Sequence, residues 1–228
     1  MHSLRTDRHV CAWWGIGAAL SASTALTTEA LAACAPAMGN TVICSGDLSG
    51  GVSLTNLEVV SIENVTSVIA PSASVPGALL VNSGAAGPSG GNGGSGLFGN
   101  LQPFSPITIK TVGADAASLR VEGGRGGDGV GTANGVGNGG GNGGDGTQAR
   151  LSTASGTYNV TSTGPEIAAL NVRSLGGGGG NGASPQLVPG VNVGGKGGDG
   201  GSANLVTLFL PSATLTTGGS GPALAVRA

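Results

Sequence analysis

Residues 194–228 read GGKGGDGGSANLVTLFLPSATLTTGGSGPALAVRA, and this stretch decides the fold. It repeats residues 140–173 at a spacing that carries residue 140 onto residue 194. The heptad GGNGGDG falls on GGKGGDG, and the strand-like segment LNVR falls on LAVR. A long-period repeat of this kind is typical of chains that bury their apolar residues by stacking similar units.

The apolar part of each unit alternates with period two. Leu119 and Val121 keep the same spacing from Gly113 as Leu170 and Val172 keep from Gly164. Such alternation is the period of a β-strand and sends both side chains to one face. The sequence therefore predicts a core ladder with one apolar pair per unit, formed by Leu79, Val81, Leu119, Val121, Leu170, Val172, Leu224 and Val226.

Strands this short bury an apolar face only when successive units stack. With 48 Gly and 11 Pro among 228 residues, a helical protein is excluded. We expect an all-β fold, a single-stranded β-helix or β-solenoid with glycine-rich loops. The expected organisation is a signal peptide (1–32), an N-terminal cap with the first solenoid turns (33–83), and a glycine-rich repeat solenoid (84–228) truncated at its C-terminus.

The glycine-rich stretches, 84–96, 123–146 and 176–201, allow two interpretations. Glycine has no side chain to fill a core and is costly to order. The stretches are therefore either mobile loops on one side of the stack or closely packed backbone that forms an extended array of its own. Composition does not separate the two.

The first 32 residues have the features of a secretory leader. Arg5 and Arg8 are followed by a mostly apolar stretch, and Ala30-Leu31-Ala32 fits a cleavage site before Ala33. An uncleaved membrane anchor is the alternative. The leader predicts an exported protein, in the periplasm during transit and then at the cell surface or outside the cell.

Two cysteines remain after the leader, Cys34 and Cys44. In an oxidising compartment a disulfide between them is the favoured interpretation. Leu31-Ala32-Ala33-Cys34 is also similar to a lipoprotein box, in which Cys34 would carry lipid. A metal site is less favoured, because the chain after the leader has no histidine.

Charge and motifs exclude several function classes. The net charge of −2, without a basic run, argues against nucleic acid as a partner. Residues 123–131, GGRGGDGVG, match one calcium-binding nonapeptide. No copy follows nine residues later, so Asp128, Asp145 and Asp199 are expected to be solvated rather than calcium ligands, and no cofactor is expected.

Catalytic residues are also hard to find. No histidine remains, and no acidic pair suggests a carboxylate dyad among Asp47, Glu58, Glu63, Asp115, Glu122 and Glu166. The sequence therefore predicts a protein that is not an enzyme. Two alternatives stay open: a secreted carbohydrate-active hydrolase on a β-helix, and an unstructured glycine-rich coat protein.

Three segments together resemble one family. Residues 33–51, ACAPAMGNTVICSGDLSGG, are similar to the start of the mature passenger region of glycine-rich bacterial autotransporters, where a short cysteine loop precedes the first turns. Residues 168–182, AALNVRSLGGGGGNG, resemble the family's strand followed by a glycine run, and residues 194–200 resemble its continuation.

This resemblance implies an exported, non-enzymatic passenger at a Gram-negative surface, structural or adhesive, with an unknown host or surface ligand. The family's members end in an outer-membrane β-barrel of many alternating strands. No such segment is present here, so the translocator is expected but not encoded in this chain.

Overall fold

The computed structural model describes residues 33–104, 106–132, 135–153, 156–185, 187–189 and 193–228, so the leader lies outside the described residues. The described residues form short strands and no helix. None of them therefore forms a helix long and apolar enough to cross a membrane. The strands are β1 (Ala33–Pro36), β2 (Thr41–Gly46), β3 (Val52–Thr55), β4 (Val59–Val65), β5 (Ala78–Ser83), β6 (Gly99–Pro103), β7 (Ile107–Val112), β8 (Ala117–Glu122), β9 (Ala149–Ser152), β10 (Tyr158–Thr163), β11 (Leu170–Leu175), β12 (Val206–Phe209), β13 (Ala213–Thr217) and β14 (Leu224–Arg227).

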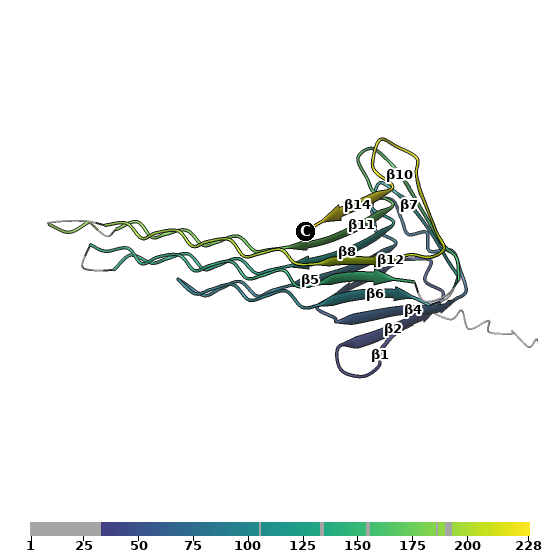
Figure 1. The fold of residues 1–228 in the computed structure, drawn as a ribbon, viewed down its shortest axis with the longest axis horizontal. Coiled ribbons are helices and arrows are strands. Elements are labelled where there is room, and N and C mark those ends of the chain that lie inside the picture. Colours follow the sequence, from purple (N-terminus) through teal and green to yellow (C-terminus); the bar gives the residue numbers. More distant parts are fainter. Residues whose placement is uncertain (1–32, 105, 133–134, 154–155, 186, 190–192) are drawn as a thin grey trace, which may run out of the picture.

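The strands assemble into three sheets, with orders β1-β2-β4-β6-β9-β12, β13-β10-β7 and β14-β11-β8-β5-β3. From β6 onward the chain visits the three sheets in turn, and each strand pairs in parallel with its equivalent in the next unit. Figure 1 shows the sheets together at one end of the molecule, with the glycine-rich segments extending from them.

The expected fold class is corrected by this arrangement. A single-stranded β-helix or β-solenoid with glycine-rich loops is not what the structure has: the strands lie in three separate open sheets, and one sheet combines parallel and antiparallel pairing. The antiparallel pair is β1 with β2. The chain reverses there through a short turn in which Gly39 has a φ of 62° and Ala37 N donates to Thr41 O, and a reversal this tight joins antiparallel strands.

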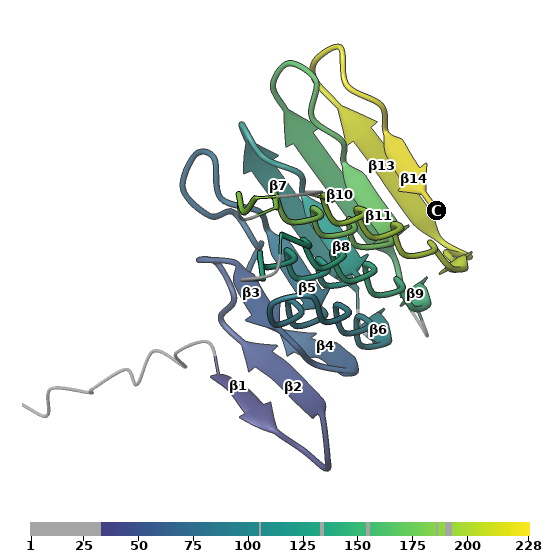
Figure 2. The same cartoon turned by 90° about the vertical axis from the view of Figure 1, so that its left-hand side faces the viewer.

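The core lies where the inner faces of the three sheets meet. Leu80, Leu119 and Val172 stack in register across β5, β8 and β11. The other two sheets contribute equivalent ladders, Ile109 with Val160 and Leu101 with Leu151. Each of these aliphatic side chains is buried, and burial of one such side chain contributes about 1.5–3 kcal/mol. Figure 2 shows the strands stacked along one direction, with β1 and β14 at opposite ends.

The predicted core ladder has the right buried residues in two units, those of β8 and β11, but the wrong register between them; Leu224 and Val226 of the last unit are exposed. Leu119 lies opposite Val172 rather than Leu170, and Leu170 lies opposite Ala117. Leu170 and Val172 do lie opposite Leu224 and Val226. Because a strand alternates with period two, a two-residue slip keeps every apolar side chain on the same face.

Leu79 and Val81 also depart from the predicted ladder. They lie on the outer face of β5 and are partly buried, whereas Leu80 and Asn82 point inward. Asn82 decides which face of β5 points inward. Its buried amide donates to Leu57 O at 2.6 Å and accepts from Leu57 N at 3.0 Å, and this compensates the desolvation of a polar group.

We predict that Leu119→Ala lowers the free energy of unfolding by about 2–5 kcal/mol, because it leaves a cavity in a fully buried ladder. Leu187→Ala is the matched control, since Leu187 is 85% exposed, and it should change stability by less than about 0.5 kcal/mol. Denaturant unfolding of both variants measures the difference. Equal effects of the two substitutions would contradict the core assignment.

Candidate functional site

Six glycine-rich segments form what we call the glycine array: three outgoing arms (84–90, 123–129 and 176–182) and three return arms (91–96, 140–146 and 194–201). Each outgoing arm continues from a strand of one sheet and each return arm leads to a strand of another. Figure 1 shows the arms running side by side away from the sheets. The interpretation of these segments as mobile loops is therefore wrong, and the packed array is correct.

Hydrogen bonds with a three-residue period join equivalent arms. Gly84, Gly87 and Gly90 donate their N–H groups to the carbonyls of Glu122, Arg125 and Asp128 at 2.8–2.9 Å. The next outgoing arm repeats the pattern from Gly123, Gly126 and Gly129. A backbone with three residues per turn, as in the polyproline II helix, presents every third residue to the same side. The arms have this period.

A second set of bonds joins outgoing arms to return arms in the antiparallel direction. Gly177 N donates to Gly144 O and Gly180 N donates to Gly141 O, both at 2.8 Å. Gly144 N in turn donates to Gly124 O at 2.8 Å. An inner arm is thus bonded on several sides, so its order comes from its neighbours and not from its own propensity.

In the inner arms, the close approach of neighbouring backbones requires glycine at two of every three positions. A Cβ at Gly144 would lie 2.0 Å from Gly94 O, and a Cβ at Gly143 would lie 1.9 Å from Gly177 O. Side chains find room only at the third position, where Asn142 and Asp145 are exposed. The repeated heptad therefore encodes backbone contact on two sides and solvent on the third.

The third position also has a bonding role that sequence reasoning missed. Asn142 accepts a hydrogen bond from Asp199 N at 2.9 Å, and Asp145 accepts from Ser202 N at 2.7 Å. Asn92 accepts from Asn142 N in the same way. Short Asn and Asp side chains thus accept hydrogen bonds from backbone N–H groups that the bonds between glycines do not use. The recurrence of Asn or Asp at every third residue is the sequence pattern that could have predicted this role.

Asp128 shows the same role with an added ion pair. Its carboxylate accepts from Asn181 N at 2.7 Å and pairs with Arg125 at 2.5 Å. The hydrogen bond from the Asn181 backbone, followed by the one from Arg125, holds the pKa of Asp128 below its ordinary value of 3.8.

The three aspartates weighed as calcium ligands lie along the array. Asp128 and Asp145 use their oxygens for neighbouring backbone N–H groups, and Asp199 lies in the last return arm opposite Asn142. Within the ranges that the structure describes, no three His, Cys, Asp or Glu residues are grouped closely enough to hold a metal ion.

The spacing between successive repeats is longer in the arms of the array than in β11 and β14. The alignment that carries 140 onto 194 holds for β11 and β14, where Leu170 lies opposite Leu224. In the arms, however, Asn142 bonds to Asp199 and Gly143 N donates to Asp199 O, which is three residues further on. A slip of three residues preserves a pattern of period three, so the glycines stay in their contacts.

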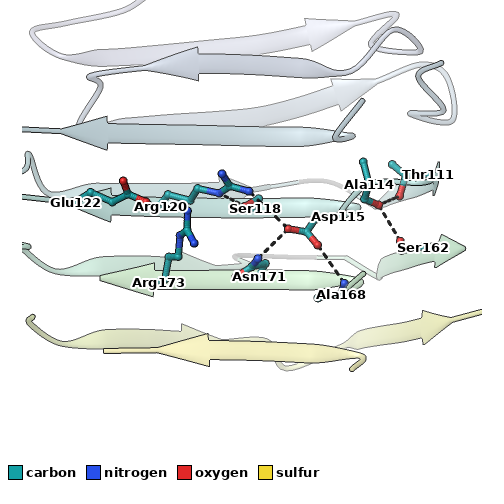
Figure 3. A network of polar contacts seen from close by, with 10 residues as sticks. All are labelled: Thr111, Ala114, Asp115, Ser118, Arg120, Glu122, Ser162, Ala168, Asn171 and Arg173. Carbon is teal, nitrogen blue, oxygen red and sulfur yellow. Dashed lines mark hydrogen bonds and ion pairs between the residues drawn. The ribbon is translucent and has the colours of Figure 1, made fainter. Parts of the chain in front are cut away.

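A polar network covers the outer face of the sheet that holds β8 and β11 (Figure 3). Asp115 accepts from Ala168 N at 3.0 Å and from Asn171 Nδ2 at 2.8 Å, and Arg120 lies 4.0 Å away. Arg173 pairs with Glu122 at 2.8 Å. These groups join neighbouring units, so the network ties one strand to the next.

The remaining predicted residues lie apart from one another. Cys34 and Cys44 form a disulfide across the β1–β2 pair. Asp47 accepts from Ser67 Oγ at 2.5 Å and from Ser49 N, and the hydrogen bond from Ser67 is the main cause that lowers the pKa of Asp47. Glu58 and Glu63 lie near and in β4, and Glu166 lies in a turn with a φ of 56°.

Comparison with protein-family models, with characterised proteins and with solved structures finds no match for this chain. The function must therefore be inferred from the array and the sheets themselves.

We predict that Gly144→Ala lowers the free energy of unfolding by about 1–3 kcal/mol, because the new methyl group must push a backbone carbonyl aside. Gly178→Ala is the matched control: nothing lies within 4 Å of its added Cβ. Alanine there should leave stability unchanged or raise it by up to about 1 kcal/mol, since it restricts the unfolded chain. Denaturant unfolding measures both, and equal losses would argue against close packing.

The Asp128 contacts predict a pH dependence. Because the folded pKa lies below 3.8, this carboxylate stabilises the array fully above that value, and the contribution is lost as the pH falls through the folded pKa. A titration of the Asp128 carboxyl carbon by NMR should give a midpoint below 3.8. Asn181→Pro, which lacks the donating N–H, should raise the midpoint, and a wild-type midpoint at or above 3.8 would contradict the assignment.

Proposed function

We propose that this protein is an exported, non-enzymatic surface protein of the autotransporter-passenger type, with a structural or adhesive role. The observation that carries the proposal is the glycine array. Its inner arms are held by backbone hydrogen bonds on several sides, so it is an ordered element that projects from the sheets.

The side chains along the array support a display role. At the third positions, Arg125, Asp128, Asn142, Asp145 and Asn181 are all exposed, while the glycines beside them are largely withdrawn from solvent. Polar and charged groups are thus set out along fixed backbone at a regular spacing. Ordered side chains lose less entropy on binding than side chains on a mobile loop, which favours contact with an extended surface.

Two further features support export. The leader at 1–32 has the features of a secretory signal. The Cys34–Cys44 disulfide staples the first strand to the second, and such bonds persist in oxidising compartments. By closing one end of the stack, this hairpin covers β4, which is otherwise an edge strand.

The proposal is tested with protein recovered from the periplasm or medium of a Gram-negative host that expresses the full chain. We expect an intact mass that begins at Ala33, with Cys34 and Cys44 oxidised. Latex beads coated with this protein should stay on an epithelial monolayer under flow at least about tenfold more often than albumin-coated beads, because many copies act together.

The array variants show whether retention depends on ordered arms. Gly144→Val, which forces arms apart, should reduce retention to the albumin level, whereas Gly178→Ala should leave it unchanged. Retention of wild-type beads no better than albumin, or an uncleaved chain in the cytoplasm, would contradict the proposal.

A further inference from the structure

The first and the last arm of the glycine array expose different groups to solvent. The first arm, 84–90, turns the side chains of Ala85, Ala86, Pro88 and Ser89 toward solvent. The last arm, 194–201, exposes the side chains of Lys196 and Asp199 at its third positions, but at its other exposed positions it has only Gly194, Gly197 and Gly200. The first side is therefore covered by side chains, and the last side presents bare backbone.

No contact within the described chain requires these last glycines. A Cβ at Gly197 or Gly200 would find its nearest atom at 3.5 or 3.6 Å, which is ordinary contact. In the preceding return arm the equivalent positions are Gly140 and Gly143, where a Cβ would lie 2.3 and 1.9 Å from a carbonyl oxygen of the next arm. The last arm thus keeps the glycines that an additional arm would require.

Hydrogen-bonding groups point to the same face. Gly140 and Gly143 donate N–H groups to the next return arm, and Gly141 O accepts from the next outgoing arm. At the equivalent positions of the last arm, the N–H groups of Gly197 and Gly200 and the carbonyl of Gly198 have no bonded partner among the described residues. Unpaired backbone groups in a regular row are a template for pairing with another chain.

Apolar side chains are exposed at this same end of the sheets. The edge strands β12 and β14 and the residue before β12 leave large side chains in solvent: Leu205 is 58% exposed, Phe209 59%, Leu224 41% and Val226 47%. The opposite end of the six-stranded sheet is covered by the β1–β2 hairpin. We call the last two arms together with β12, β13 and β14 the open face.

We propose that the open face binds the open face of a second copy of this chain, which gives a two-fold symmetric dimer. A two-fold axis parallel to the arms preserves the direction in which each arm runs and exchanges the places of the outgoing and return arms. Arm 176–182 of one copy therefore lies along arm 194–201 of the other. This is the antiparallel relation by which outgoing and return arms pair inside the array. The antiparallel pairing of arms within one chain is thus repeated between two chains.

The contrast between the two ends favours this partner over an open-ended assembly. A head-to-tail contact would require the open face to fit the end that the hairpin and the side chains of the first arm cover. A contact between two open faces is self-complementary and closes after two copies. The exposed apolar side chains of β12 and β14 would be buried in the same contact.

The test is the mass of the mature protein in solution, measured by sedimentation equilibrium and light scattering at up to about 100 µM. We expect a dimer for the wild type. Gly197→Ala with Gly200→Ala should raise the dimer dissociation constant by at least about tenfold, because a methyl group on each blocks backbone contact. Circular dichroism should show the fold unchanged, since a Cβ has room at both sites.

Gly178→Ala serves as the control. Gly178 belongs to an arm of the open face, but it holds the third position, which Arg125 occupies with an exposed side chain in the preceding outgoing arm, and nothing lies within 4 Å of an added Cβ. This variant should dimerise like the wild type. A wild-type protein that stays monomeric over the whole concentration range would overturn the proposal. So would a double variant that dimerises as tightly as the wild type. Neither readout depends on attachment to cells, so failure here is distinct from failure of the proposed function.

Discussion

The closeness of neighbouring backbones in the glycine array is the constraint on which the rest of the structure depends. An inner arm packs against its neighbours at distances that leave no room for a Cβ at two of three positions, as at Gly143 and Gly144. Ordering glycine costs more entropy than ordering any other residue. That cost is offset because each inner arm is bonded on several sides, and each bond contributes about 0.5–1.5 kcal/mol.

The array and the sheets share one hydrogen-bonded framework. Gly84 N donates to Glu122 O at the end of β8, and Gly123 N donates to Leu175 O at the end of β11. The ladder that joins the strands of one sheet therefore continues without a break into the outgoing arms. Outside the sheet, Asp115 and Arg173 tie successive units together, so the stacking of strands and the stacking of arms reinforce each other.

Much of the local structure follows from sequence periodicity, whereas register does not. The Leu-x-Val pattern correctly places Leu119 and Val172 inside, but its two-residue period conceals a slip of two residues. The glycine heptads conceal a slip of three in the same way, since Asp199 lies opposite Asn142. Register is fixed instead by contacts between units that no single segment records.

Asn82 shows a second limit of the pattern. The alternating apolar pair Leu79 and Val81 looks like the core face of β5, because the other face, with Leu80, also contains the amide of Asn82. The sequence pattern therefore predicts that the wrong face of this strand points inward. The buried amide of Asn82 instead bonds the backbone of Leu57 and Phe98, which lie far from it in sequence. The role of Asn and Asp along the array was hidden for a similar reason, because their partners are N–H groups in other arms.

The most direct test of packed arms is scalar coupling across their hydrogen bonds, measured by NMR on uniformly labelled mature protein. The account predicts a coupling between Gly144 N and the Gly124 carbonyl carbon, and another between Gly177 N and the Gly144 carbonyl carbon. Absence of both couplings, with amide exchange at random-coil rates throughout the arms, would contradict it.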